Sequence, residues 1–133
     1  MGFLLDTNVC VDYLNGRFPA VVRRIQEAAP DDLCTSAVAV AELRYGADRS
    51  RNVRRNHARL DDFLREIRCV GFDEGAARLF GKIRATLEAA GTPIGPYDTM
   101  IAAHAKHLGL TLVTDNEREF FRVAGLRIEN WRG

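Results

Sequence analysis

Three acidic residues in separate parts of the sequence, Asp6, Glu42 and Asp98, stand where a carboxylate is costly. Asp6 follows a short apolar run, and Glu42 lies in a segment that would be apolar on nearly every side of a helix. Asp98 falls on the same helical stripe as Ile101 and Ala102. A buried carboxylate costs free energy unless a hydrogen bond, a cation or a proton compensates its charge.

Each of these acids has an ordinary explanation when it is taken alone. Asp6 could cap a helix, Glu42 could form a buried ion pair with an arginine, and Asp98 could favour the dipole of a helix that starts at Pro96. If the three converge, their mutual repulsion must be relieved by protons, arginines or a cation. An oxygen-rich site without sulfur suits Mg²⁺ or Mn²⁺, which bind phosphate oxygens and activate water for phosphodiester hydrolysis.

The elements that must position these acids alternate between short apolar strands and helices. This pattern predicts an α/β fold with a central, mainly parallel sheet of four to five short strands flanked by helices. We expect strands at residues 3–6, 33–36, 68–72, 110–114 and 126–130, and helices at residues 7–15, 19–29, 38–47, 51–67, 73–90, 96–108 and 117–123. Ligand sites in such sheets lie at the carboxyl ends of the strands, which is the edge expected to hold Asp6, Asp98 and residues 114–116.

The composition limits the classes of protein to which the chain can belong. The 133 residues are 47% hydrophobic and 28% charged, with a net charge of +1, which suits one globular domain spanning residues 1–133. No apolar run approaches the roughly 18 residues of a membrane helix, and the start MGFLLDTN lacks a signal-peptide core. The three widely spaced cysteines predict neither a disulfide framework nor a zinc site. We therefore expect a cytoplasmic protein without a membrane partner.

Basic charge is concentrated in the segment from Arg44 to Arg68, which holds eight arginines against four acids. A solvated helical face is the ordinary interpretation of such a segment. The alternative is a surface that holds the phosphates of RNA beside the acidic site without reading sequence. The residues expected to make such contacts are Arg44, Arg51, Arg54 and Arg55.

Four short motifs occur in order along the chain: LLDTN at residues 4–8, SAVAVAEL at 36–43, PYDTMIAAHA at 96–105 and LVTDNEREF at 112–120. Together they resemble the PIN-domain ribonucleases, in particular the VapC-type toxins of bacterial toxin–antitoxin pairs, from about residue 3 to residue 129. The resemblance implies that Asp6 and Asp98 are the main Mg²⁺ ligands, with Mn²⁺ as a substitute. Glu42 would help to hold the metal or orient its water.

The fourth acid of this family pattern is missing from its usual place, two residues after the Thr that ends the fourth strand. Asn116 occupies that place, Asp115 precedes it and Glu119 lies one helical turn later. Asn116 could hold water through its amide oxygen, or Glu119 could complete the site, and the sequence leaves both open. The side chains expected to support the site from behind are Thr7, Ser36, Thr114 and Asp115. The histidines, at positions 57, 104 and 107, are expected on the surface.

The function implied by the resemblance is Mg²⁺-dependent cleavage of a tRNA or another structured RNA by the toxin of a VapBC-type pair. Water oriented by Glu42 and the corner at Asn116 and Glu119 would attack the phosphorus in line, leaving a 3′ hydroxyl and a 5′ phosphate. The resemblance also implies a homodimer that assembles further with a VapB-like antitoxin, whose C-terminal segment would cover the cleft near the arginines. The alternative is a catalytically inactive PIN-like module that binds RNA or protein.

Two other α/β families that place an Asp after their first strand fit less well. A haloacid-dehalogenase-type phosphatase needs a second Asp where Asn8 stands. A response-regulator receiver needs an acidic pair before its phosphorylated Asp and a Lys at the end of a late strand, whereas the only lysines are Lys82 and Lys106. We therefore expect neither a phosphatase nor a receiver.

Overall fold

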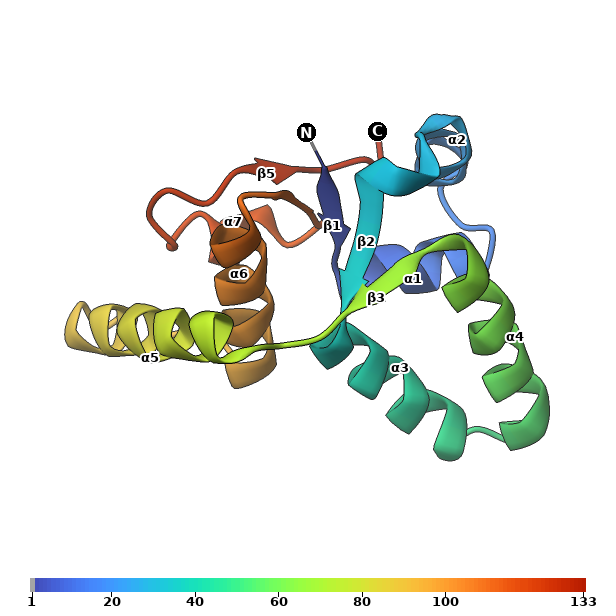
Figure 1. Cartoon of the computed structure of the whole chain (residues 1–133), viewed down its shortest axis with the longest axis horizontal. Coiled ribbons are helices and arrows are strands. Elements are labelled where there is room, and N and C mark those ends of the chain that lie inside the picture. Colours follow the sequence, from blue (N-terminus) through green and yellow to red (C-terminus); the bar gives the residue numbers. More distant parts are fainter. Residues whose placement is uncertain (1) are drawn as a thin grey trace.

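The fold is built around a parallel sheet in which the first strand lies in the middle (Figure 1). The computed structural model describes residues 2–133, so Met1 of the predicted domain 1–133 lies outside the described part. The strands are β1 (Phe3–Leu5), β2 (Leu33–Ser36), β3 (Arg68–Val70), β4 (Thr111–Val113) and β5 (Ile128–Glu129), in the order β3-β2-β1-β4-β5. All four strand pairs are parallel, as predicted.

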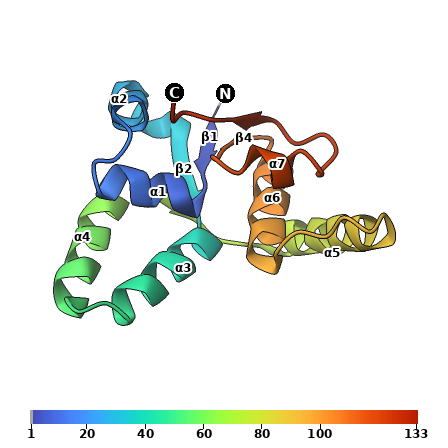
Figure 2. The same cartoon turned by 180° about the vertical axis from the view of Figure 1, so that it is seen from behind.

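Helices cover both faces of this sheet. They are α1 (Thr7–Leu14), α2 (Pro19–Glu27), α3 (Ala37–Asp48), α4 (Val53–Glu66), α5 (Glu74–Ala89), α6 (Pro96–Leu108) and α7 (Glu117–Phe120), with a 3₁₀ helix at Pro30–Asp32. Figures 1 and 2 show α1 to α4 gathered on one side of the molecule and α5 to α7 on the other. No helix within residues 2–133 has the length and apolar character needed to cross a membrane.

The sheet separates two hydrophobic cores because successive residues of a strand point to opposite faces. Leu5 and Val113 face the core under α1 to α4, where they join Leu43, Phe63 and Trp131. The other core lies under α5 to α7, and the side chains that build it include Leu4, Cys34, Leu112, Ile83, Ile101, Ala102, Ala105 and Phe120. Strands that are buried on both faces read as continuous apolar runs, which is why β1 and β4 were recognisable in the sequence.

The predicted elements are all present, although several are shorter than expected. Helix α6 has the predicted bounds, and it ends at Gly109, whose φ of 69° is the left-handed conformation that glycine adopts without strain. Strand β3 stops at Val70 because its partner Ser36 is the last residue of β2 before α3 begins. Residues 71–72 therefore have no neighbouring strand with which to pair. The 3₁₀ helix was not anticipated from the sequence.

Candidate active site

Asp6 is the most tightly held of the predicted site residues. It follows β1 at the carboxyl edge of the sheet, caps α1 and is only 3% exposed. Its Oδ1 accepts a hydrogen bond from the backbone N–H of Thr7 at 2.6 Å, and its Oδ2 accepts one from Thr114 Oγ1 at 2.7 Å. Its own N–H donates to the carbonyl of Val113 at 3.0 Å. Both the main chain and the carboxylate of Asp6 are thus fixed against β4.

Glu42 is tied to the same place through one hydroxyl. Thr7 Oγ1 donates a hydrogen bond to Glu42 Oε1 at 2.7 Å, so Thr7 contacts Asp6 with its backbone and Glu42 with its side chain. Thr7 and Thr114, which the sequence suggested as supports of the site, thus each donate a side-chain hydrogen bond to a carboxylate. Glu42 reaches this position because α3 begins directly after β2, with Ser36 as its N-cap.

Asp98 faces the other acids from the first turn of α6. Partial burial, followed by the charges of Glu119, Glu42 and Asp115, raises its pKa to about 6. Burial also raises the pKa of Asp6 to about 6, with further contributions from the charges of Asp98 and Asp115, against the lowering effect of its hydrogen bond from Thr114. The acids therefore oppose one another's ionisation, as expected for carboxylates that share a poorly solvated space.

At the position expected for the fourth acid of the site, Asn116 and Glu119 lie together. Asn116 Nδ2 donates a hydrogen bond to Glu119 Oε2 at 3.1 Å, and the Asn116 N–H donates to Thr114 Oγ1 at 3.0 Å. The charge of Glu119 contributes more to the pKa shift of Asp98 than any other charge does. Asp115 is held elsewhere, because its Oδ2 pairs with Arg132 Nη1 at 3.0 Å and its Oδ1 accepts from Asn8 Nδ2 at 3.4 Å.

The donor set suits a hard divalent cation. Carboxylate and amide oxygens surround the carboxyl edge of β1 and β4, and charge repulsion among them would be relieved by a cation. Within residues 2–133, however, no three His, Cys, Asp or Glu side chains already converge closely enough to form a metal cluster. The acids are electrostatic neighbours that a cation would have to draw closer together.

Ser36 and His104 do not behave as predicted. The Ser36 hydroxyl accepts a hydrogen bond from Val38 N at 3.0 Å and lies 2.8 Å from His104 Nδ1, so its expected bond to a carboxylate is not formed. The expectation that His104 lies on the surface is wrong, since it is only 1% exposed and its ring packs edge-on against Phe72. A helix that is buried on several sides can carry a histidine inside when a hydroxyl partners its ring nitrogen.

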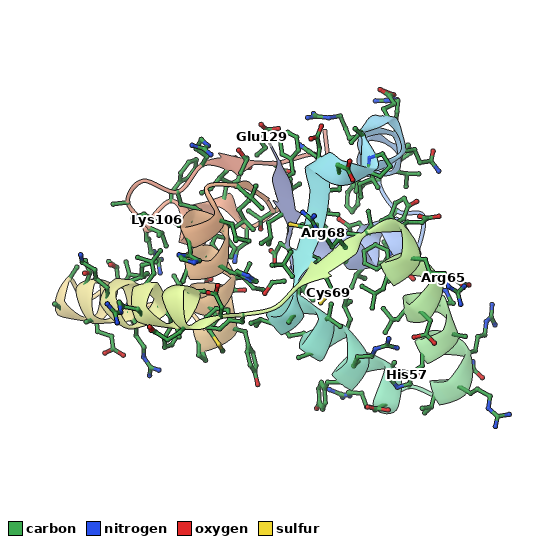
Figure 3. The ribbon with its side chains drawn as sticks, in the orientation of Figure 1. His57, Arg65, Arg68, Cys69, Lys106 and Glu129 are labelled. Atoms are coloured by element: carbon green, nitrogen blue, oxygen red, sulfur yellow. The ribbon has the colours of Figure 1, made fainter. Side chains whose placement is uncertain are left out.

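The predicted arginines fall into two groups. Arg44 joins α3 to α4 through Asp61 Oδ1 at 2.7 Å and through His57, so it supports the helical pair and is not a free surface cation. Figure 3 shows His57 near the start of α4, on the side of that helix that is toward α3. The other three predicted contact residues, Arg51, Arg54 and Arg55, are exposed around the start of α4.

A groove of about 310 Å³ leads away from the acids between α1, α3 and α4. Thr7 and Glu42 line it on the side of the acids, and Asn56 and Arg59 contribute polar groups. The remaining walls are mostly apolar and include Val11, Leu14, Leu43 and Leu60. The groove could therefore hold an extended or helical segment with an apolar face that ends near the carboxylate of Glu42.

Comparison with known proteins supports the family suggested by the motifs. The sequence model of the PIN-domain family matches residues 3–126 of the chain. The chain belongs to the PIN-domain family. A relative from Shigella flexneri, named tRNA(fMet)-specific endonuclease VapC, is 44% identical over 129 residues, which cover 97% of each chain. A relative from Salmonella typhimurium with the same name is 42% identical over 97% of each chain.

Solved structures of PIN-domain proteins place the chain with VapBC complexes. The DNA-bound VapBC of Salmonella typhimurium superposes with a TM-score of 0.93 at 40% identity and covers 98% of both chains. VapBC-1 of nontypeable Haemophilus influenzae superposes with a TM-score of 0.92 at 30% identity and covers both chains fully. The chain is thus similar along its whole length to VapC ribonucleases. A divalent cation is the general class of cofactor for PIN-domain ribonucleases.

Sequence reasoning missed Arg132, which contacts Asp115 and Asp12 together. No motif marks this arginine. A signal was present in α1, where Asp12 interrupts a mostly apolar helix and is buried in the structure. A buried acid requires a partner, but the sequence does not say which cation provides it.

Proposed function

We propose that this PIN-domain protein is an endoribonuclease toxin whose divalent cation is held by Asp6, Asp98 and Glu42, with Glu119 at the fourth corner. The observation that carries the proposal is the group of acids at one sheet edge, in which Asp6 and Asp98 both have a pKa raised to about 6. A fold keeps such a costly arrangement where function requires it. Mg²⁺ or Mn²⁺ would neutralise these charges and polarise the scissile phosphate.

The protein side chains divide the remaining work. Asp6 keeps one orientation because both of its oxygens accept hydrogen bonds, and each oxygen retains a lone pair for the cation. Glu42 is fixed through Oε1 by Thr7, so Oε2 can accept a hydrogen bond from the attacking water. The water oxygen would form a bond to phosphorus while its proton passes to a carboxylate, and the bond from phosphorus to the 3′ oxygen would break. The leaving 3′ oxygen would take up a proton from the solvent. The products are a 3′ hydroxyl and a 5′ phosphate.

We propose a structured RNA as the substrate, with the initiator tRNA as the first one to test. The support is the 44% identity, over 97% of both chains, to a relative named as a tRNA(fMet)-specific endonuclease. Arg51, Arg54 and Arg55 are exposed around the start of α4 and could hold the phosphate backbone near the groove. Contacts of this kind weaken with added salt, whereas base recognition depends less on it.

We also propose that a VapB-like antitoxin occupies the groove between α1, α3 and α4. An apolar stripe on its C-terminal segment would pack against Leu43 and Leu60, and a basic side chain beyond that stripe would reach Glu42. Such a side chain would relieve the repulsion that a cation otherwise relieves, and the toxin would thereby be inhibited. The assembly proposed is a cytoplasmic homodimer that associates further with the antitoxin.

The test is cleavage of total RNA by the full chain after removal of its antitoxin, with EDTA and with added Mg²⁺. We expect Mg²⁺-dependent cuts with 5′-phosphate ends, which Asp98→Asn abolishes. Asp31→Asn is the matched control, because Asp31 is exposed and lies before β2 at the opposite edge of the sheet. A wild-type protein without metal-dependent cleavage, or cleavage that survives Asp98→Asn, would favour the inactive binding module.

A further inference from the structure

Arg132 binds two acids with all three nitrogens of its guanidinium group. Its Nε lies 2.8 Å from Asp12 Oδ2 and its Nη2 lies 3.1 Å from Asp12 Oδ1, which is the two-pronged geometry of a strong arginine–carboxylate pair. Its Nη1 lies 3.0 Å from Asp115 Oδ2. The side chain of Asp12 is only 3% exposed, whereas those of Arg132 and Asp115 are 31% and 22% exposed.

Neighbouring groups hold the guanidinium where it can make these contacts. The ring of Phe18 lies beneath it, with 4.3 Å between the guanidinium carbon and the ring centre. The backbone N–H of Arg132 donates to Asn130 Oδ1 at 2.9 Å. The preceding residue, Trp131, is buried and packs edge-on against Phe3 of β1 at 5.1 Å between ring centres. The arginine is therefore anchored to α1 and β1 before it reaches Asp115.

Asp115 is the acid whose position this arrangement decides. It follows Thr114, the residue that bonds Asp6, and its charge opposes ionisation of both Asp6 and Asp98. One of its oxygens faces Arg132 and the other accepts from Asn8. We propose that Arg132 is a positioning residue, which holds Asp115 apart from the acids of the proposed metal site and offsets its charge, and so lowers the affinity of that site for divalent cations.

This inference rests on the proposed function, because it concerns the cation that Asp6 and Asp98 would hold. Its physical basis is that a carboxylate near a cation site strengthens binding, whereas a guanidinium paired with the same carboxylate weakens the negative field that it adds at the site. The pairing leaves Glu119, which has no arginine partner within residues 2–133, as the acid available at the fourth corner. The pairing with Arg132 thereby keeps Asp115 from competing with Glu119 for that place.

The experiment measures Mn²⁺ binding by calorimetry on the full chain without RNA, so that activity is not the readout. Removing Arg132 alone would leave Asp12 as an unpaired buried charge and could unfold the protein. The main variant is therefore Asp12→Asn with Arg132→Gln, which removes one charge of each sign and leaves Asp115 without its cation. The matched control is Arg84→Gln with Glu88→Gln, which removes an exposed ion pair of 3.2 Å on α5. Melting curves check that each variant is folded.

We expect the main variant to bind Mn²⁺ roughly threefold to tenfold more tightly than wild type, as expected for one charge acting through a partly screened medium. Adding Asp115→Asn should remove this gain, and the α5 control should bind like wild type. An unchanged affinity in the main variant, or a gain in affinity that persists after Asp115→Asn, would overturn the role proposed for Arg132. Either result would leave the proposed metal site standing. A wild-type chain that binds no Mn²⁺, or one whose binding survives Asp98→Asn, would overturn the proposed metal site and this inference with it.

Discussion

Replacing Asp98 by asparagine should stabilise the metal-free protein near neutral pH and remove its response to Mg²⁺. Burial and the charges of Glu119, Glu42 and Asp115 raise the pKa of Asp98 from 3.8 to about 6. An ionised Asp98 therefore destabilises the folded state, and a neutral amide of the same shape avoids this cost. The same amide is a weaker ligand for a cation, so stability and metal binding should change in opposite directions.

The size of the effect follows from the shift in pKa. A rise of about two units corresponds to roughly 3 kcal/mol at neutral pH. Asp98 is partly exposed, so solvent screening reduces this to roughly half. Loss of a negative charge from the first turn of α6 costs about 0.5 kcal/mol in return. The net gain for Asp98→Asn is about 1 kcal/mol, or about 3 to 6 °C in melting temperature for a chain of this size.

The stability that Asp98→Asn gains over wild type should increase with pH. The folded protein holds the Asp98 proton more tightly than the unfolded chain does, so this proton contributes most to stability below about pH 4. That contribution is lost as the pH rises through about 6. Wild type and Asp98→Asn should therefore have similar stabilities at about pH 4 and diverge by about pH 7.5, where the side chain of the wild type is ionised.

Urea unfolding in EDTA, followed by the fluorescence of Trp131, measures this directly, because Trp131 is the only tryptophan and is buried. Added Mg²⁺ should then raise the free energy of unfolding of wild type and leave that of Asp98→Asn unchanged. The stability difference between the two proteins should therefore shrink or change sign. The exposed variant Asp31→Asn should follow wild type throughout. A stability difference that does not vary with pH, or an equal response of both proteins to Mg²⁺, would refute the reasoning.

Three further predictions concern the support of Asp6, the core beneath α7 and the end of α6. Thr114→Val should lower the free energy of unfolding by about 2 kcal/mol, because the hydroxyl both donates to Asp6 and accepts from a backbone N–H; denaturant unfolding at neutral pH measures it. Phe120→Ala should lower the free energy of unfolding by about 3 to 5 kcal/mol because the side chain of Phe120 is fully buried. Phe121 is 70% exposed, so Phe121→Ala should change the free energy of unfolding, measured in the same way, by less than about 0.5 kcal/mol. Gly109→Ala should lower the free energy of unfolding by about 1 kcal/mol because a residue with a Cβ is strained at φ 69°; equal melting temperatures would contradict this.

Local chemistry made most of the fold predictable. The central strands are apolar on both faces, so β1, β2 and β4 are visible as short runs whatever their neighbours. Helix ends carry their own signals, as Asp73 at the start of α5 and Gly109 at the end of α6 illustrate. The lengths of the edge strands β3 and β5 were overestimated. The length of an edge strand depends on how far its neighbouring strand continues, and no local sequence pattern records this.

The site was predictable where it depends on strand ends and not where it depends on distant pairing. Asp6 and Thr114 lie at the ends of adjacent strands, so the fold alone brings them together. Ser36 was misassigned because its hydroxyl pairs with a histidine on α6, and a surface position was wrongly expected for that histidine. The contact between Asp12 and Arg132 joins opposite ends of the chain, and single-sequence reasoning carries no information about it.

The place of β1 in the middle of the sheet has a consequence for the order in which the chain is made. β1 is synthesised before the other four strands, yet one of its two neighbours in the sheet, β4, is the fourth strand of the five in chain order. Until Thr111–Val113 and Thr114 emerge, one edge of β1 lacks its partner and Asp6 lacks its second hydrogen bond. A nascent chain that has not reached this point holds the acids in separate, unassembled segments. The acidic site therefore cannot take its final form until β4 and Thr114 have been synthesised and have paired with β1 and Asp6.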